Sequence, residues 1–145
     1  MTGQQSVERD DLGQEAKQAL GAVFTQKTDQ HLDFRSGSFQ LVQKHIVDMT
    51  IRVEAARALG MRAAHALQAG KDVRQACSIA KLYATEAAQE VASMALQVHG
   101  GMGYSEDYPI ARIFRDTRGG MIPEGTTEIQ TLIAGREILG INAIT

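Results

Sequence analysis

Cysteine and proline are scarce in this 145-residue sequence, and each scarcity excludes a class of structure. A single cysteine, Cys77, excludes an internal disulfide framework and suits a reducing compartment, so we expect a cytoplasmic protein. Both prolines, Pro109 and Pro123, fall in the last third, which leaves the preceding sequence free of helix-breaking proline. Long apolar runs are also missing. None approaches the roughly 20 residues of a membrane-spanning helix, and the N-terminus lacks the apolar stretch of a signal peptide.

An excess of charge of either sign is absent as well. The chain has 15 basic and 17 acidic residues, and its formal net charge of -2 gives no field that would favour nucleic acid or an anionic membrane as a partner. Histidine and cysteine show no spacing typical of a zinc site, so no metal centre is expected. The length and the 43% hydrophobic content fit one compact domain. Function must therefore be sought in local motifs.

What the sequence does contain is helical periodicity. Residues 1–9 are polar and predict a disordered tail, after which Asp10 offers an N-cap for a helix to about Lys27. A clearer helix is predicted from Phe39 to Ala69, since its apolar residues recur at three- and four-residue steps. This stripe consists of Phe39, Val42, Ile46, Met49, Val53, Ala56, Ala63 and Leu67.

A third helix follows the turn at residues 70–72, and its alanines allow close helix packing. Shorter helices are predicted over about 109–114 and 127–139, and no stretch alternates like a strand. The pattern predicts an all-α fold, an antiparallel four-helix-type bundle over residues 10–145, in which the short turn makes the second and third helices neighbours. The apolar stripe of the third helix consists of Ala80, Ala84, Ala87, Val91, Met94 and Val98.

Two glycine-containing segments bracket the short helix. The first, residues 97–104, has Gly100, Gly101 and Gly103 in four positions, which lets the backbone approach a ligand closely. Glycine is also the usual end of a helix, so a plain C-cap is the competing interpretation of this cluster. For His99, likewise, a structural role at the helix C-terminus competes with a ligand contact.

The second segment, residues 121–130, carries a glutamate between a rigid proline and a glycine. Thr127 and Gln130 predict a capping box, so the last helix begins here and directs unpaired backbone N–H groups at the loop. Such a terminus favours an anion. Glu124, directly before it, is placed to present a carboxylate as a general base, although an isolated loop glutamate is more often simply solvated.

In this order, the segments resemble the C-terminal α-helical domain of the acyl-CoA dehydrogenase family. The resemblance covers about Gly37 to Gly140, and the stretch from Gln97 to Glu124 has the family's usual length without a gap. The matching motifs are Gly37-Ser38-Phe39-Gln40, residues 97–104, Tyr108-Pro109, Arg115-Asp116, Glu124-Gly125-Thr126 and Glu128-Ile129-Gln130.

The resemblance implies roles in an FAD-dependent α,β-dehydrogenation of an acyl-CoA thioester. Glu124 corresponds to the family's catalytic base, which takes the α-proton while hydride leaves the β-carbon, and Gly125 corresponds to a contact with the acyl-CoA substrate. Thr126, Thr127 and Glu128 correspond to FAD contacts at the start of the last helix. A further set of FAD contacts, usually made to the neighbouring subunit of an oligomer, corresponds to Gln40, Gln97, Val98, His99, Gly100 and Gly101.

The resemblance also has gaps. Asp29 stands where the family has an arginine for the FAD phosphates, and Pro123 replaces a common aromatic residue. The family's other two domains, a β-barrel and a second helical domain, have no counterpart in these 145 residues. We therefore expect activity only in a complete assembly. The expected partners are further copies of the chain, in a homo-oligomer, and, in addition, a longer acyl-CoA dehydrogenase subunit. The chain is then an excised fragment, a natural short subunit or a degenerate relative of the family, and these three remain open. The alternative is a non-catalytic helical assembly module derived from the family.

Overall fold

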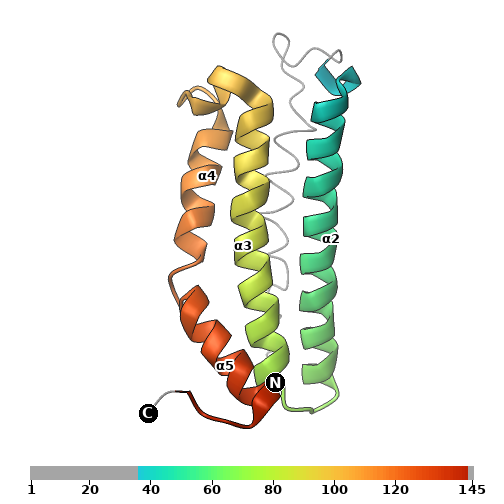
Figure 1. Cartoon of the computed structure of the whole chain (residues 1–145), viewed down its shortest axis with the longest axis vertical. Helices are drawn as coiled ribbons and strands as arrows, with labels where there is room; N and C mark the ends of the chain where they lie inside the picture. Colours follow the sequence, from blue (N-terminus) through green and yellow to red (C-terminus); the bar gives the residue numbers. More distant parts are fainter. Residues whose placement is uncertain (1–35, 144–145) are drawn as a thin grey trace, which may run out of the picture.

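The computed structural model describes residues 36–143, which contain helices and no strand. The elements are η1 (Ser36–Ser38), α2 (Gln40–Gln68), α3 (Arg74–His99), η2 (Gly100–Tyr104), α4 (Pro109–Gly120) and α5 (Thr127–Leu139) (Figure 1). The predicted all-α fold is confirmed. The predicted tail at 1–9, the predicted helix at 10–27 and Asp29 lie outside the described residues.

The central element of the described bundle is α3. Figure 1 shows α2 antiparallel to α3 on one side, while α4 and α5 follow one another along its other side. The predicted turn at residues 70–72 joins α2 to α3 and makes them neighbours. Since α4 and α5 both run against the direction of α3, the connection between them comes to lie beside the first half of α3. This places a loop from late in the chain against a helix formed much earlier.

The apolar core lies where α2, α3 and α4 meet. Met49 and Val53 of α2 are buried with Val91 and Ala95 of α3 and with Ile110 of α4. Burial of each of the larger side chains contributes about 1.5–3 kcal/mol. The small residues of α3 let its neighbours approach closely, so this alanine-rich helix is covered within the chain. Its buried alanines are Ala87, Ala92 and Ala95.

The stripe on α2 is buried over less of its length than the sequence predicted. Phe39 and Leu67 are 63% and 64% exposed, because they lie at the two ends of the helix, beyond the buried stretch from Met49 to Ala63. The helix ends where Gly70 takes a φ of +67° and its N–H bonds the carbonyl of Leu67. The middle of α2 therefore carries its packing.

The predicted end of α4 at Phe114 is wrong, since the helix continues to Gly120. The extension is anchored by Thr117, which is buried and whose hydroxyl lies 3.1 Å from the Phe114 carbonyl oxygen and 3.2 Å from Gln89 Oε1 on α3. This contact with α3 outweighs the low helix propensity of the two glycines that follow.

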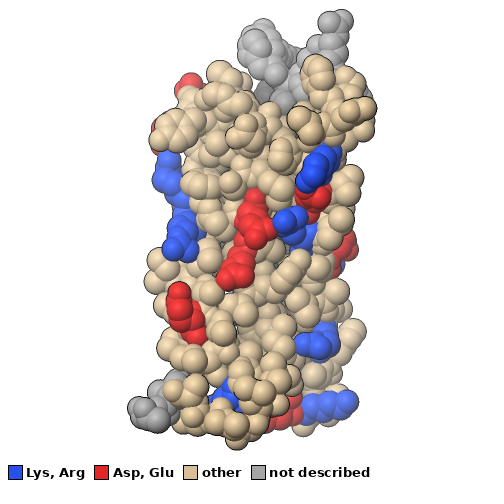
Figure 2. Space-filling model, in the orientation of Figure 1, with Lys and Arg blue, Asp and Glu red and all other residues tan. Residues whose placement is uncertain are grey.

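The surface of the described bundle carries charges of both signs. Figure 2 shows lysine and arginine interspersed with aspartate and glutamate between wide uncharged areas. Across the seam between the two long helices, Arg52 of α2 donates to the carboxylate of Glu90 on α3. Within residues 36–143, no helix is long and apolar enough to cross a membrane.

Candidate functional site

The connection between α4 and α5 is held by side chains from two other elements. Lys81 on α3 donates from Nζ to the carbonyl oxygen of Pro123, at 2.5 Å, and to that of Gly125. Gln130, on α5 itself, donates from Nε2 to the carbonyl oxygen of Glu124, at 3.1 Å. Three consecutive carbonyl groups are therefore fixed, two of them by a residue 42 and 44 positions away along the chain.

Glu124 has a left-handed backbone, with φ of +56°, and no other non-glycine residue in 36–143 has a positive φ. This conformation costs an L-residue about 1–2 kcal/mol. Gly125 follows with φ of +99°, and a Cβ there would lie 2.7 Å from Nε2 of Gln130. The backbone angle thus requires glycine at this position, and a larger residue would also displace the Gln130 amide. The fixed carbonyl groups offset the strain at Glu124.

The side chain of Glu124 is exposed, in contrast to its fixed backbone. Within the described part of the chain, no hydrogen bond or ion pair engages its carboxylate. A strained residue that presents an unengaged functional group is typical of ligand-binding and catalytic positions. The geometry therefore suits a carboxylate that acts on a bound ligand and not on another residue of this chain.

The predicted start of α5 at Thr127 is confirmed, but the predicted capping box is wrong. The N-cap is Thr126, whose hydroxyl accepts a hydrogen bond from the N–H of Ile129 at 3.5 Å. Gln130 cannot complete a capping box because its side chain serves the carbonyl of Glu124 instead. Thr126, which caps α5, and Gln130, which bonds the loop, thus both act at the first turn of this helix.

Two further residues of this turn differ in how they are engaged. The hydrogen bond from the Thr126 side chain lowers the pKa of the Glu128 carboxyl below its ordinary value, with the backbone N–H of Glu128 as the second cause. The hydroxyl of Thr127 is buried and has no hydrogen-bond partner in residues 36–143. The carboxylate of Glu128 is therefore engaged at the helix start, whereas Thr127 keeps an unused polar atom.

The glycine-rich segment is the end of α3 followed by η2 rather than an open loop. Gly103 is buried, and a Cβ there would lie 2.7 Å from the Leu96 carbonyl oxygen and 2.8 Å from the Cβ of His99. At Gly100 and Gly101 an added Cβ would meet nothing within 4 Å. One glycine of the cluster is thus required for packing, and the other two border open space.

His99 has a structural role at this end of α3. Its Nδ1 lies 2.7 Å from the carbonyl oxygen of Ala95, and since a carbonyl oxygen only accepts, Nδ1 carries the proton. The ring also packs edge-on against Tyr108, with centroids 6.3 Å apart. The capping interpretation therefore accounts for one face and one nitrogen of the imidazole, and Nε2 is left for another contact.

The residues predicted from the sequence fall into two groups. The first lies at the α4–α5 connection, against Lys81. The second lies at the far end of α3, where α2 also begins (Figure 1). From Lys81 to Gln97 the α3 axis rises about 24 Å, at 1.5 Å per residue. The first group is Glu124, Gly125, Thr126, Thr127 and Glu128, and the second is Gln40, Gln97, Val98, His99, Gly100 and Gly101.

Lys81 is the residue that sequence reasoning missed. It lies far from Glu124 along the chain, and no local motif joins the two. The sequence feature that could have identified it is its context. It is the one lysine of α3, a helix rich in alanine and other apolar residues. A cation on a helix that packs on both sides needs partners, and here they are backbone carbonyl groups.

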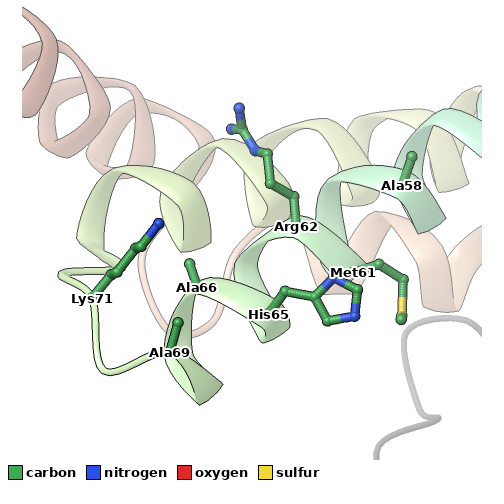
Figure 3. A pocket seen from close by; sticks show the side chains of 7 residues that line it. All are labelled: Ala58, Met61, Arg62, His65, Ala66, Ala69 and Lys71. Carbon is green, nitrogen blue, oxygen red and sulfur yellow. The ribbon is translucent and has the colours of Figure 1, made fainter.

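A separate hollow on α2 contains none of the predicted site residues. Figure 3 shows the ring of His65 beside Met61, and Arg62 and Lys71 projecting beside small alanine side chains. Among the described residues, no group of three or more His, Cys, Asp or Glu side chains is placed to hold a metal ion. The hollow is lined by Ala58, Met61, Arg62, His65, Ala66, Ala69 and Lys71.

In sequence, the chain is similar to several proteins named as acyl-CoA dehydrogenases. Residues 15–139 match the domain described as acyl-CoA dehydrogenase, C-terminal domain. The chain is 44% identical over 100 residues to cyclohexane-1-carbonyl-CoA dehydrogenase of Geobacter metallireducens, covering 69% of this chain and 26% of that protein. It is 42% identical over 101 residues to a short-chain-specific acyl-CoA dehydrogenase of Megasphaera elsdenii, covering 70% and 26%.

The fold agrees with the sequence comparison. The structure of butyryl-CoA dehydrogenase from Megasphaera elsdenii matches with a TM-score of 0.79 and 35% identity, over 88% of this chain and 34% of that one. Glutaryl-CoA dehydrogenase from Mycobacterium smegmatis matches with a TM-score of 0.82 and 27% identity, over 92% and 35%. The chain thus spans about a quarter to a third of the length of these relatives.

Proposed function

The chain belongs to the acyl-CoA dehydrogenase family, and from that premise we propose that it supplies the catalytic base and part of the FAD site of an assembled acyl-CoA dehydrogenase. The reaction is the α,β-dehydrogenation of an acyl-CoA thioester. One observation carries the proposal: Glu124 presents an exposed carboxylate from a left-handed backbone that is pinned by neighbouring helices.

Glu124 acts by taking a proton from the α-carbon of the substrate. The α-proton of a thioester is weakly acidic, so a base must be fixed against it at contact distance. A carboxylate oxygen of Glu124 accepts this proton, and the adjacent Gly125 leaves room for the acyl chain because it has no side chain. FAD, when bound, supplies the acceptor for the hydride that leaves the β-carbon as the double bond forms.

The start of α5 fits the polar part of a flavin cofactor. The buried hydroxyl of Thr127 has no partner among the described residues. Of the first three N–H groups of α5, that of Ile129 bonds the Thr126 hydroxyl and that of Glu128 bonds its own carboxyl, which leaves the N–H of Thr127 for a ligand. We assign Thr126, Thr127 and Glu128 to this contact. The Thr127 hydroxyl in particular needs a partner, and a cofactor oxygen or nitrogen is a suitable one.

The second group of residues supports an assembly in which subunits share their sites. It lies about 24 Å along α3 from the Glu124 connection, too far to serve the same end of the same cofactor. Gln40 and residues 97–101 are therefore assigned to the FAD of a neighbouring subunit. Gly100 and Gly101 border open space there, which lets another chain or its cofactor approach.

Exposed apolar residues on α5 support association with a further chain. Ile129, Leu132 and Leu139 follow one side of the helix and are 42%, 36% and 70% exposed. Burying such a stripe is favourable, and a second copy or a longer family subunit would cover it. The same surface also suits the second candidate function, a helical assembly module that does not catalyse. The two candidates differ only in whether Glu124 acts as a base.

An experiment that supplies the missing domains tests the proposal. The C-terminal domain of the Megasphaera elsdenii short-chain enzyme is replaced by this chain, and acyl-CoA-dependent dye reduction is measured with short-, medium- and long-chain substrates. We expect turnover that Glu124→Gln abolishes. A chimera that folds, retains FAD and oxidises none of these substrates would contradict the catalytic proposal and favour the assembly module.

The isolated chain gives a second, simpler measurement. Since the two groups of FAD-matching residues lie apart on one chain, we expect the purified protein to be colourless and to bind added FAD weakly, if at all. Flavin fluorescence titration measures this. A yellow protein with one FAD per chain would show that the other domains are dispensable for cofactor binding.

A further inference from the structure

We propose that Lys81 is a positioning residue that holds Glu124 in its left-handed conformation and thereby aims the carboxylate. The inference rests on the proposed function, because it concerns how the proposed base is held. Its conformational part concerns this chain alone, so it can be tested whether or not the chain takes part in catalysis.

The geometry of the contact links the lysine to the backbone angle. Lys81 Nζ accepts nothing and donates to the carbonyl groups on both sides of Glu124, those of Pro123 and Gly125. For both carbonyl groups to face one ammonium group, the chain must curl around it. Positive φ angles at Glu124 and Gly125 provide that curl. Hydrogen bonds from a charged donor are about twice as strong as neutral ones, which suits a contact that must resist strain.

Gln130 provides a further contact from α5. Its amide bonds the carbonyl of Glu124 itself, and a Cβ at position 125 would sit 2.7 Å from that amide nitrogen. The left-handed residue is therefore fixed at its own carbonyl and at both flanking ones. Without Lys81, the two flanking carbonyl groups are free to turn to water, and Glu124 relaxes toward negative φ with its carboxylate displaced.

Lys81 has no competing role that would explain its position. No ion pair within residues 36–143 involves it, and its only side-chain hydrogen bonds there are with the loop. Its stem is half-buried against the bundle, and methionine preserves most of that packing without the donor. Lys81→Met is therefore a selective way to release the loop, and Lys71→Met is a matched control because Lys71 is exposed at the α2–α3 turn.

The first test reads the backbone of Glu124 in the purified chain by NMR. We expect wild type and Lys71→Met to show the Cα and Cβ shifts and the HN–Hα coupling of a left-handed residue, and Lys81→Met to show those of negative φ. Should Lys81→Met not fold, Lys81→Leu removes the same donor while keeping an apolar side chain and is read in the same way. A Glu124 that stays left-handed in the folded variant would overturn the proposal.

Proteolysis measures the same release independently. A glutamyl endopeptidase should cut the Glu124–Gly125 bond about tenfold faster in Lys81→Met than in wild type, because the freed loop opens more often. The Glu106–Asp107 bond, in the exposed turn before α4, is the internal reference and should be cut at an unchanged rate. Equal rates at Glu124 in the two proteins would contradict the role of the lysine.

Chemical rescue separates the ammonium group from mere bulk. The chain has one cysteine, so Cys77→Ser combined with Lys81→Cys leaves a single thiol, which 2-bromoethylamine converts to a close analogue of lysine. We expect aminoethylation to restore the left-handed shifts and the resistance to cleavage, and alkylation with iodoacetamide to restore neither. Rescue by both reagents would mean that packing, and not the donor, holds the loop.

Kinetics in the chimera complete the test. Lys81→Met should lower kcat about a hundredfold and leave KM unchanged, since a displacement of about 1 Å at a reacting group has that effect. In a Glu124→Gln background it should cause no further loss. If Glu124 changes conformation but kcat does not fall in an active chimera, the positioning role is overturned. If the wild-type chimera is inactive, the proposed function fails, and the conformational inference is decided by the NMR and proteolysis results.

Discussion

The two connections that flank α4 are built in opposite ways. The connection from α4 to α5 owes its shape to hydrogen bonds from Lys81 and Gln130, and it contains a strained residue, Glu124. The connection from α3 to α4 begins with η2 and owes its shape to the close approach of Gly103 to the last turn of α3. In the first case the determinants are side chains outside the loop, and in the second they lie within it.

This difference predicts where each connection is vulnerable. A loop held by distant donors changes shape when a remote helix is altered, but its own exposed residues are free to serve a ligand. A turn held by its own glycine tolerates changes elsewhere and fails when that glycine acquires a side chain. The expected location of the reacting group in the first connection, and of closely packed backbone in the second, fits this division.

The largest expected effect tests whether the α4–α5 connection carries the base. In the active assembly, Glu124→Gln should lower kcat by about a hundred- to ten-thousand-fold, because the amide keeps the size of the side chain but cannot take the α-proton. Binding of FAD and substrate should change little. Steady-state kinetics and flavin content measure both quantities.

The control for this experiment is Glu128→Gln, which alters a carboxylate four positions later. Its pKa is lowered by its bond from Thr126, and a carboxylate with a lowered pKa is a weaker base. We expect a far smaller loss of kcat. Equal and modest losses in the two variants would show that the connection is only structural.

The α3–α4 connection is tested by Gly103→Ala. The added methyl group would overlap the Leu96 carbonyl and the Cβ of His99, so we expect a loss of about 1–3 kcal/mol in the free energy of unfolding. Urea denaturation followed by circular dichroism measures it. Gly101→Ala, with open space around the added atom, should cost well under half as much. A harmless Gly103→Ala would remove the contrast between the two connections.

A change at the N-cap of α5 should have a smaller effect on stability, and it tests where the α4–α5 connection ends and the helix begins. Thr126→Ala removes the hydroxyl that bonds the N–H of Ile129 and should cost about 0.5–1 kcal/mol in the free energy of unfolding, since the bond is long at 3.5 Å. It should also raise the pKa of Glu128 back toward its ordinary value, as measured by NMR titration. Thr127→Val, which removes an unpartnered hydroxyl, should be neutral or stabilising.

The smallest effect is expected at the turn between α2 and α3. This turn contains neither a strained residue such as Glu124 nor a closely packed glycine such as Gly103. Hydrogen bonds from the side chain and then the backbone N–H of Arg74 lower the pKa of Asp72 from 3.8 to about 2. A carboxyl whose pKa is lowered in the folded state stabilises it above the unfolded value and loses that contribution as pH falls through the folded value. The Tm difference between wild type and Asp72→Asn should therefore shrink from pH 4 to pH 2. A difference that stays constant over that range would contradict the assignment.

The sequence predicted the fold from features that are local. The stripe from Met49 to Val53, the alanines of α3 and the bounds of α5 follow from local sequence patterns, and the structure agrees with them. The end of α4 could not be predicted in the same way. There a buried Thr117 packs against α3 and extends the helix through two glycines, which is a tertiary effect that propensity does not contain.

The candidate site shows the same limit. Glu124 and Gly125 were identified from their motif, yet the motif does not reveal that Glu124 is left-handed, because the donors that fix it lie on other elements. The capping box failed for a related reason. Thr127 and Gln130 have the right spacing, but Gln130 finds a better acceptor in the loop, which shifts the cap to Thr126.

The uninterrupted length of α3 has a consequence for how such a chain can change. The helix fixes the distance between two groups of residues. Lys81 lies in its first half, and residues 97–101 lie at its C-terminal end. Deleting one residue between Lys81 and residue 97 would shorten the distance between the two groups by about 1.5 Å and rotate one group by about 100° relative to the other. The two groups would then no longer lie as they do relative to one another. Insertions and deletions are therefore expected in the turns at 70–72 and 105–108, and not in the helix between Lys81 and residue 97.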